Sequence, residues 1–341
     1  MASTPLISVI VPVWNTARYL PECLDSLRAQ TLADIEIICV DDASTDDSLD
    51  ILRHYARLDA RILVFALPGN QRMGGARNFG IEQARAPYVG FVDSDDVVSP
   101  DFYNNLYRTI VARAADIALT SYTVFDASTR EVAFSGARGV IARLKHEGVH
   151  NVRGMKKAFG PHWSEDQDFS QLRVELSAFP TVVNKLYRRT LFDTARFQDG
   201  ILFEDLLFTP QVLHLARRVF SCLGGEYYYR RHPASATRRQ GFADLREKLL
   251  VAGMLDQWAR QAGMEVAEKG RYEDLVRQKY HQAVKSLVKR VHLWTPARIQ
   301  WVREHAPEEA YRYFRVRLLR KVIAAAALAA LQVVSLWLVL R

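Results

Sequence analysis

The stretch "APYVGFVDSDDVVSP", residues 86–100, decides the fold. Its apolar run from Tyr88 to Val92 has the length of a buried strand and ends at three acids, Asp93, Asp95 and Asp96. Carboxylates this close together repel one another unless a positive group lies among them. The stretch therefore predicts a buried strand that ends at a charged site.

Similar apolar runs alternate with helical patterns along the first 125 residues. Strands are predicted near 6–13, 35–40, 62–67, 88–92 and 116–125, and helices near 18–30, 44–58, 76–85 and 100–114. This alternation is typical of an α/β protein with a mostly parallel, Rossmann-like sheet covered on both faces. Ligands of such sheets bind beyond the carboxyl ends of the strands, where Trp14, Asp42 and Asp93 fall.

Composition excludes several classes of protein. The chain has 341 residues, 49% hydrophobic and 25% charged, which excludes a mostly disordered protein. Its three cysteines are far apart and lack metal-ligand spacing, so a reducing compartment is favoured over a disulfide framework. The first residues, "MASTPLISVIVPVW", have no basic start and no cleavage-site pattern, and we expect a first strand there, not a signal peptide.

Positive charge gathers toward the carboxyl end. Residues 271–321 contain thirteen Lys/Arg and five Asp/Glu, an excess equal to the net charge of +8 of the whole chain. The apolar run 322–340 follows, and as a helix it would be about 28 Å long, close to the thickness of a bilayer core. We favour a membrane-associated helix, either spanning the bilayer or lying in its surface, over a buried Ala/Leu core helix. Anionic lipids, and not nucleic acid, are the expected partners of the basic residues before it.

The middle of the chain is less regular. Residues 126–200 show no clear periodicity, while a helix is predicted at 205–217 and a strand at 226–230. Residues 242–321 are basic and helical, with Pro296 and Pro307 as breaks, so the domain boundary is expected near Gly241.

Two acids, Asp41 and Asp42, end the second predicted strand in "VDDASTDDS", residues 40–48. Ser44 and Asp46 are typical helix caps, but capping does not account for the acids that precede the cap. A carboxylate in this place can accept a hydrogen bond from a nucleobase N–H or a ribose hydroxyl.

The glycine-rich turn "GNQRMGGARNFG", residues 69–80, matches neither the dinucleotide fingerprint nor the Walker pattern. Its Arg77 is therefore open to two interpretations. The side chain is solvated on a flexible turn, or its guanidinium serves a diphosphate or braces Asp93 or Asp95.

The triplet Asp93-Ser94-Asp95 also has two interpretations. Acids at a strand end are commonly turn formers. Here a buried strand precedes them and other acid-bearing strand ends are expected alongside. Mg²⁺ and similar cations take carboxylate oxygens together with substrate phosphates, so the predicted positive group is a divalent metal carried in with a nucleotide diphosphate.

Six motifs in order carry a resemblance to a known family: "ISVIVPVWN", "VDDASTDDS", "ARNFGI", "FVDSDD", "FEDLLF" and "YYYRRHPASAT". From residue 6 to about 240 the chain resembles the bacterial family 2 inverting glycosyltransferases, which have the type-A nucleotide-sugar fold. The family moves a sugar from a nucleotide donor, most often UDP-linked, with inversion at the anomeric carbon. The resemblance implies a catalytic domain at 1–241, with a nucleotide-binding half at 1–125 and an acceptor half at 126–241.

The resemblance also implies roles for single residues in the nucleotide half. Pro12 and Trp14 would contact the nucleotide sugar, Trp14 by stacking on uracil where the family more often has Tyr. Asp42 would accept from the uracil and Arg77 would lie near the nucleotide. Asp93 would lie near ribose and diphosphate and, with Asp95, hold Mg²⁺ or Mn²⁺. Ala43 stands where the family often has Gly.

Glu204 and Asp205 start an apolar helix. Without the resemblance, they read equally well as first-turn acids favoured by the helix dipole. Inverting transfer needs a carboxylate that removes the acceptor hydroxyl's proton. The family places this base on the Asp of such a pair, so the resemblance implies Asp205 as base, with Glu204 orienting it or binding acceptor.

The segment Tyr227–Arg239 is the last candidate. Its three tyrosines read equally well as an edge strand. Arg230 and Arg231 are candidates for stabilising the leaving diphosphate, and His232 is either structural or a ligand of metal or phosphate. Ser235 and Thr237 are candidate hydroxyl donors from a loop that closes over the donor.

Together these features predict a metal-dependent hexosyltransferase at the cytoplasmic face of the inner membrane. It would move sugar from a UDP-sugar to a glycan or polyprenyl-diphosphate-linked acceptor in bacterial polysaccharide or glycoconjugate biosynthesis. Two alternatives remain: a nucleotidyltransferase that shares the sheet and acids, and a non-catalytic membrane-binding scaffold that explains only the basic region and tail.

Overall fold

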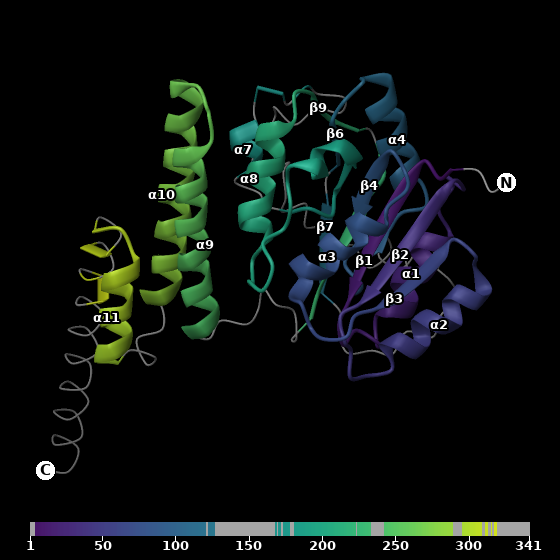
Figure 1. Cartoon of the computed structure of the whole chain (residues 1–341), viewed down its shortest axis with the longest axis horizontal. Coiled ribbons are helices and arrows are strands. Elements are labelled where there is room, and N and C mark those ends of the chain that lie inside the picture. The colour runs from purple at the N-terminus through teal and green to yellow at the C-terminus, as the bar shows by residue number, and fades with distance from the viewer. Residues whose placement is uncertain are drawn as a thin grey trace, which may run out of the picture. The chain divides into compact units, whose positions relative to one another are not determined.

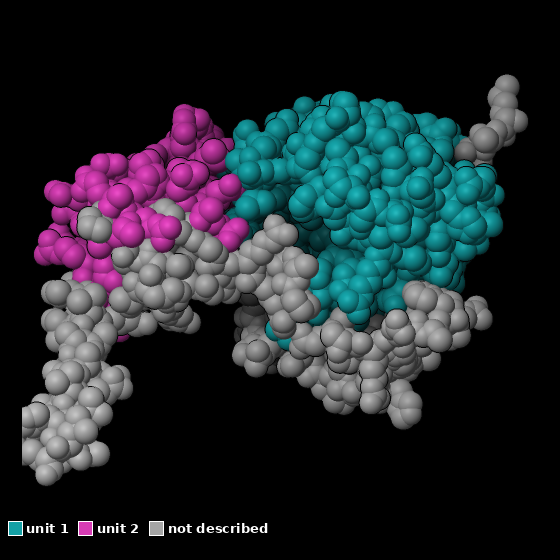
Figure 2. Space-filling model, turned by 90° about the horizontal axis from the view of Figure 1, so that it is seen from below, with its two compact units in different colours: residues 1–238 teal, residues 239–341 magenta. Residues whose placement is uncertain are grey.

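The computed structural model describes residues 4–120, 122–126, 168, 170–171, 173–177, 181–222, 224–232, 242–288, 295–308, 311–312, 315 and 317–318. The chain divides into two compact units, residues 1–238 and 239–341 (Figure 2). Every candidate site residue belongs to the first unit, whose carboxyl-edge loops carry the site described below.

The first unit is built on a seven-stranded sheet with the order β3-β2-β1-β4-β8-β6-β9. All neighbours pair in parallel except β8, which is antiparallel to both β4 and β6. Every residue of β1 and β2 is buried, which explains why both strands are apolar except for Ser8 in β1 and for Glu36 and Asp41 in β2. The predicted mostly parallel α/β sheet is confirmed. The strands are β1 Ile7–Val13, β2 Ile35–Asp41, β3 Ile62–Ala66, β4 Tyr88–Phe91, β6 Ile117–Leu119, β8 Lys185–Arg188 and β9 Val219–Ser221.

Helices join the parallel strands and cover the sheet (Figure 1). The chain runs outward from β1 to β2 and β3, and then returns past β1 to β4. Because parallel crossovers are right-handed, α1 and α2 on the outward path cover one face, and α3 on the return path covers the other. The helix α3 begins four residues before the predicted start at residue 76, so Gly74 and Gly75, which were predicted to lie in a turn, are helical. A Cβ on Gly74 would lie 2.8 Å from the carbonyl oxygen of Gln198, so close packing of the 197–199 segment requires glycine there. The helices are α1 Leu20–Arg28, α2 Ser48–Leu58, α3 Arg72–Gln83 and α4 Phe102–Ala112.

The prediction of one strand at 116–125 was wrong, because the chain changes sheets in the middle of it. The strand β6 ends at Leu119, and β7, Tyr122–Asp126, belongs to a second sheet of order β5-β10-β7. The chain leaves the first sheet at Thr120. Its N–H donates to the carbonyl of Asn184 (3.0 Å), and its hydroxyl donates to the carbonyl of Gly225 (3.0 Å). The other two strands of the second sheet are β5 Val97–Val98 and β10 Tyr227–Arg231.

Several short elements between residues 126 and 226 were not predicted from the sequence. They include β8, β9, α7 Arg173–Ser177 and the 3₁₀ turn η2 Arg189–Asp193. Elements of three to five residues are too short for a periodic hydrophobic pattern to develop. The predicted helix at 205–217 is observed as α8, Asp205–Leu215.

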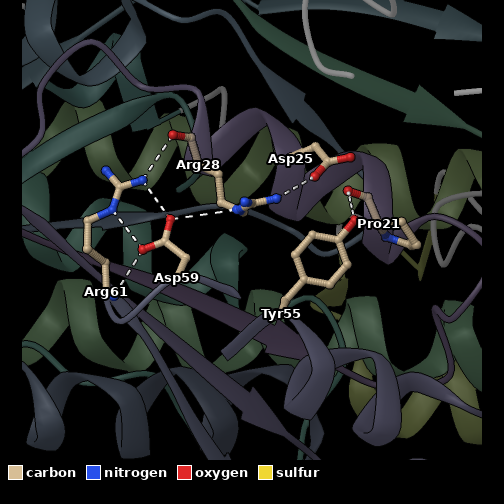
Figure 3. A network of polar contacts seen from close by, with 6 residues as sticks. All are labelled: Pro21, Asp25, Arg28, Tyr55, Asp59 and Arg61. Atoms are coloured by element: carbon tan, nitrogen blue, oxygen red, sulfur yellow. Dashed lines mark hydrogen bonds and ion pairs between the residues drawn. The ribbon is translucent and has the colours of Figure 1, made fainter. Parts of the chain in front are cut away.

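A polar network fastens α1 to the turn between α2 and β3 (Figure 3). Arg61 donates from Nη2 to Asp59 (2.8 Å) and to the backbone carbonyl of Arg28 (2.9 Å), and Tyr55 reaches the carbonyl of Pro21 (3.4 Å). The carboxyl end of a crossover helix lies at the amino edge of the sheet, so Arg28, Asp59 and Arg61 are far from the strand ends that bind ligand. The network is structural.

Gly90 in β4 provides a test of the packing between sheet and α4. A Cβ there would lie 2.5 Å from Cε1 of the buried Tyr103 ring. Overpacking of this kind costs about 1–3 kcal/mol, so Gly90→Ala is expected to lower the melting temperature by about 2–12 °C. Thermal unfolding measures it. Gly69→Ala, whose Cβ meets nothing within 4 Å, is the control. A Gly90→Ala protein that melts with the wild type would show that the ring moves aside without cost.

The second unit contains helices α9 Phe242–Gln261, α10 Val266–Val288 and α11 Pro296–His305. Apolar side chains of α9 such as Leu249 and Leu255 are buried in it, and Trp258 packs edge-on against Tyr272 of α10 (5.4 Å between centroids). The helix α11 begins at Pro296 and ends before Pro307, as the sequence predicted. In the described part of the chain, no helix is long and apolar enough to cross a bilayer. The predicted membrane helix 322–340 lies outside the described residues.

Candidate active site

The loops that follow β1 and β2 are tied together at the carboxyl edge of the sheet. Asn15 accepts from the N–H of Thr45 (2.7 Å) and donates its own N–H to Ser44 Oγ (3.1 Å). Asn15 and Ala43 have φ values of 53° and 57°, and such left-handed backbone concentrates at functional sites. The conformation also explains why glycine suits the position of Ala43. The indole of Trp14 is 46% exposed and offers an open aromatic face.

Asp42 ties the start of α3 to the same edge. Its Oδ1 accepts from the N–H of Gln71 (2.6 Å), and its backbone carbonyl accepts from the Asn70 amide (3.2 Å). Burial raises the pKa of the Asp42 carboxyl, and hydrogen bonds from the backbone N–H groups of Gln71 and Arg72 lower it in part. Pro12 is buried in β1 beside Val40 of β2. The structure therefore brings Pro12, Trp14 and Asp42 to one edge.

Arg77 joins two acids from different halves of the first unit. Its Nη2 lies 2.7 Å from Oδ1 of Asp93, and its Nη1 pairs with Glu204. The Arg77 side chain is 3% exposed and lies over the ring of Phe197 (5.3 Å). Burial alone lowers the pKa of the guanidinium, but the charges of Asp93 and Glu204 raise it, and the net shift is upward. The sequence left the role of Arg77 open, and the structure supports the interpretation in which its guanidinium braces Asp93.

Asp96 is the structural acid of the opening stretch. It is completely buried and accepts from the hydroxyl of Tyr227 (2.6 Å) and from the backbone N–H of Arg230 (2.7 Å). Burial and the charges of Asp95 and Asp93 raise its pKa well above the usual value. Asp96 therefore fastens the turn between β4 and β5 to β10, and leaves Asp93 and Asp95 to face the site.

Asp95 meets His232. Oδ2 of Asp95 lies 2.9 Å from Nε2 of His232, and the two side chains are 24% and 9% exposed. The ring of Tyr19, just before α1, packs on the imidazole with 4.6 Å between centroids. Each acid of the opening stretch thus has its own partner, and two of these partners come from β10 or the residues after it.

Arg230 is enclosed in protein. It is 6% exposed, pairs with Glu22 of α1, and donates from Nε to the backbone carbonyl of Asp95 (2.7 Å). Its guanidinium lies between two rings, 5.1 Å from the centroid of Tyr19 and 4.7 Å from that of Phe125. These contacts hold the side chain against the protein at the turn that carries Asp95.

Glu204 and Asp205 form the other side of the site. Phe203 before them has a φ of 61°, and Asp205 is the first residue of α8. Glu204 is 6% exposed and carries the ion pair to Arg77. Burial, and next the charge of Glu204, raise the pKa of Asp205 to about 7. A carboxylate with this pKa can accept a proton near neutral pH, as a general base must.

The donors at Asp95 and His232 fit a divalent cation. A carboxylate and an imidazole face each other there, and both are ligand types that Mn²⁺ accepts. Among the residues that the structure describes, no three His, Cys, Asp or Glu side chains form a metal cluster. Two protein donors match a cation that takes its remaining ligands from substrate phosphates and water.

The structure says less about three of the predicted site residues. Arg231 is half-buried on β10, next to Arg230. Ser235 and Thr237 lie outside the described residues. The other predicted residues gather at the carboxyl edge of the sheet: Pro12, Trp14, Asp42, Arg77, Asp93, Asp95, Glu204, Asp205, Arg230 and His232.

Three residues of the site were not found from the sequence: Tyr19, Glu22 and Tyr227 as a partner of Asp96. Glu22 looks like an ordinary first-turn acid of a helix. Its partner Arg230 is 208 residues away, so no local pattern could reveal the pair.

Known proteins are similar to this chain in sequence. The Glycosyl transferase family 2 profile matches residues 8–193. Glycosyltransferase GlyG of Streptococcus pneumoniae serotype 4 is 31% identical over 237 residues, 69% of this chain and 74% of that protein. Glycosyltransferase GlyA of the same organism is 35% identical over 233 residues, 68% of this chain but only 31% of GlyA, so the chain spans about a third of its length.

A solved structure shows the same fold. The crystal structure of Staphylococcus aureus TarS 1–349 in complex with UDP-GlcNAc aligns with a TM-score of 0.61 and 20% sequence identity, covering 92% of this chain and 88% of TarS 1–349. The type-A nucleotide-sugar sheet expected from the resemblance is therefore confirmed. The chain belongs to family 2 of the glycosyltransferases.

Proposed function

We propose that this glycosyltransferase moves a sugar from a UDP-sugar to a lipid-linked or surface-glycan acceptor, with inversion and with Mg²⁺ or Mn²⁺. The observation that carries the proposal is the chain of ion pairs Asp93–Arg77–Glu204. It joins the donor-side acids to the residue next to Asp205. A UDP donor is supported by the UDP-GlcNAc complex of the similarly folded TarS and by the exposed indole of Trp14, which offers a stacking face for uracil.

Each group has one part in the proposed chemistry. Asp205 takes the proton of the acceptor hydroxyl, and the oxygen attacks C1 of the sugar from the side opposite the diphosphate. The bond from C1 to the UDP oxygen breaks, and UDP leaves with the electron pair. A divalent cation, when bound at Asp95 and His232, neutralises the diphosphate. The positive charge of Arg77 offsets the negative charges of Asp93 and Glu204 and so reduces the repulsion between them.

We also propose that the enzyme works at the cytoplasmic face of the inner membrane. The support is the sequence alone: the basic residues of 271–321 and the apolar run 322–340. Anionic lipid attracts such basic segments by about 1 kcal/mol per Lys or Arg near the surface. Placement there would bring the site to acceptors carried on lipid.

UDP release from a panel of UDP-sugars tests the proposal. The detergent-purified chain is assayed with and without Mn²⁺ or Mg²⁺, and with and without a bacterial lipid-linked acceptor extract. Release from one donor that needs both metal and extract is expected. Pyrophosphate release from a nucleoside triphosphate would instead support a nucleotidyltransferase, and no turnover of any nucleotide donor would leave the scaffold alternative.

The rate of transfer is expected to depend on pH through Asp205. Its pKa is raised to about 7, so the carboxyl group is protonated below that pH and cannot act as base. Above pH 7 the rate should reach a plateau, and it should fall about tenfold for each pH unit below 7. A pH profile of kcat at saturating donor measures this.

Lys185 is the control for that profile, because burial lowers its pKa to about 7 as well. Its Nζ is bonded to Asn184 Oδ1 (2.9 Å). Both groups lose a proton as pH rises through 7, but only Asp205 is the base in the proposed chemistry. Lys185→Met should therefore keep the rise of kcat around pH 7. A profile that is flat in the wild type, or that loses its rise in Lys185→Met, would contradict the assignment to Asp205.

A further inference from the structure

The buried pair between Glu22 and Arg230 has no part in the proposed chemistry. It nevertheless contacts the turn Asp95–Asp96, called the metal-binding turn below because Asp95 is a proposed metal ligand. The two side chains are 9% and 7% exposed, and they join the first turn of α1 to β10. Removing two charges from water carries a penalty, which attraction offsets only where the geometry is good and further hydrogen bonds are made. Arg230 makes those further bonds to the Asp95–Asp96 turn.

Arg230 holds that turn at two points. Its Nε donates to the backbone carbonyl of Asp95 (2.7 Å), and its backbone N–H donates to the carboxylate of Asp96 (2.7 Å). The antiparallel register, with Tyr228 opposite Val97, brings Arg230 to this position. The bond to this carbonyl fixes the backbone from which the Asp95 side chain extends, and Oδ2 of that side chain meets Nε2 of His232.

Tyr19 extends the arrangement to the imidazole. Its ring contacts both the guanidinium of Arg230 (5.1 Å) and the ring of His232 (4.6 Å). Glu22 lies three residues after Tyr19, in the first turn of the helix that Tyr19 caps. One helix start thus supplies a carboxylate that anchors Arg230 and a ring that supports Arg230 and His232.

We propose that Glu22, Arg230 and Tyr19 are positioning residues that fix Asp95 and His232 for a divalent cation on the donor diphosphate. The inference rests on the proposed function of this site. It assigns Arg230 to holding the metal-binding turn, and so away from direct contact with the diphosphate. Residues that orient metal ligands typically change metal affinity by about 10- to 100-fold when they are replaced.

The test measures Mn²⁺ binding, not turnover. Full-length Glu22→Gln is titrated with Mn²⁺ in the presence of UDP, with free Mn²⁺ followed by electron paramagnetic resonance, and UDP binding without metal is measured by calorimetry. We expect Mn²⁺ affinity about 10- to 100-fold weaker and metal-free UDP affinity unchanged. Arg230→Lys should behave alike, because lysine can pair with Glu22 but cannot also make the Nε bond to the Asp95 carbonyl.

Glu36→Gln is the matched control. Glu36 is also a buried glutamate paired with an arginine, Arg85 (2.6 Å), but it lies near the start of β2, at the amino edge of the sheet. It should lose thermal stability and keep its Mn²⁺ affinity. The half-buried Tyr19 keeps the inference testable if Glu22→Gln does not fold, because Tyr19→Leu should also weaken Mn²⁺ binding.

Three results would each overturn this inference and leave the proposed function standing. The first two are a wild-type Mn²⁺ affinity in folded Glu22→Gln and a wild-type Mn²⁺ affinity in Tyr19→Leu. The third is a weaker metal-free UDP affinity in Arg230→Lys, because it would place Arg230 on the diphosphate. A wild-type protein that binds no UDP, with or without Mn²⁺, would overturn the proposed donor and the inference with it.

Discussion

Asp205→Asn is expected to lower kcat by about 10²- to 10⁴-fold and to leave UDP affinity unchanged. The amide has the size and shape of the carboxyl group but cannot take up the acceptor's proton at neutral pH. Burial and the charge of Glu204 raise the pKa of Asp205 to about 7, which suits a group that must take up a proton near neutral pH. Steady-state kinetics with the donor from the UDP-sugar panel, and calorimetry with UDP, measure the two effects.

Asp193→Asn is the control for this prediction. Asp193 is an exposed acid at the end of η2, in the same unit of the protein, and it has no part in the site. Its replacement should change neither kcat nor UDP affinity. Full activity in Asp205→Asn would show that another group removes the proton, and a loss of UDP binding would show that Asp205 serves the donor.

Arg77→Gln is expected to lower the free energy of unfolding by about 3–5 kcal/mol, because it leaves the buried Glu204 and the half-buried Asp93 without their shared cation. Asp93 and Glu204 are 19% and 8% exposed, and neither can recover its hydration without moving. In a unit of 238 residues this corresponds to a fall in melting temperature of about 6–20 °C. Activity should fall with it, since Asp93 and Glu204 lose their fixed positions. Thermal unfolding and kinetics below the melting temperature separate the two effects.

Arg53→Gln is the matched control. Arg53 pairs with Asp50 on α2, where the side chains are 59% and 81% exposed, and solvent screens such a pair. Its loss should change stability by less than about 1 kcal/mol. If Arg77→Gln is as stable as Arg53→Gln, the two acids must hold protons or move to solvent, and Arg77 would not act as a brace between Asp93 and Glu204.

The sequence predicted much of the sheet because buried parallel strands have a strong local signal. The runs around Ile7, Ile35 and Tyr88 are mostly apolar, and the structure has strands at all of them. Each strand end is set by a change of residue type, such as the acids after Phe91. The ends of parallel strands meet at one edge, so these local signals were enough to gather Trp14 and Asp93 in one place.

The sequence failed where an element depends on distant partners. Residues 116–125 read as one strand, but Thr120 leaves the first sheet because Asn184 and Gly225 offer it hydrogen bonds. The strand β8 has four residues and forms because β4 and β6 leave a place between them. No window of sequence contains that information.

The sequence by itself determined the mostly parallel sheet, the family and the main acids, since each depends on residues that are close along the chain. Only the tertiary structure decided how those acids are held: Arg77 between Asp93 and Glu204, and Arg230 between Glu22 and the Asp95 carbonyl. The physical reason is that a buried charge takes its partner from whatever chain folds against it. For Glu22 that partner is 208 residues away.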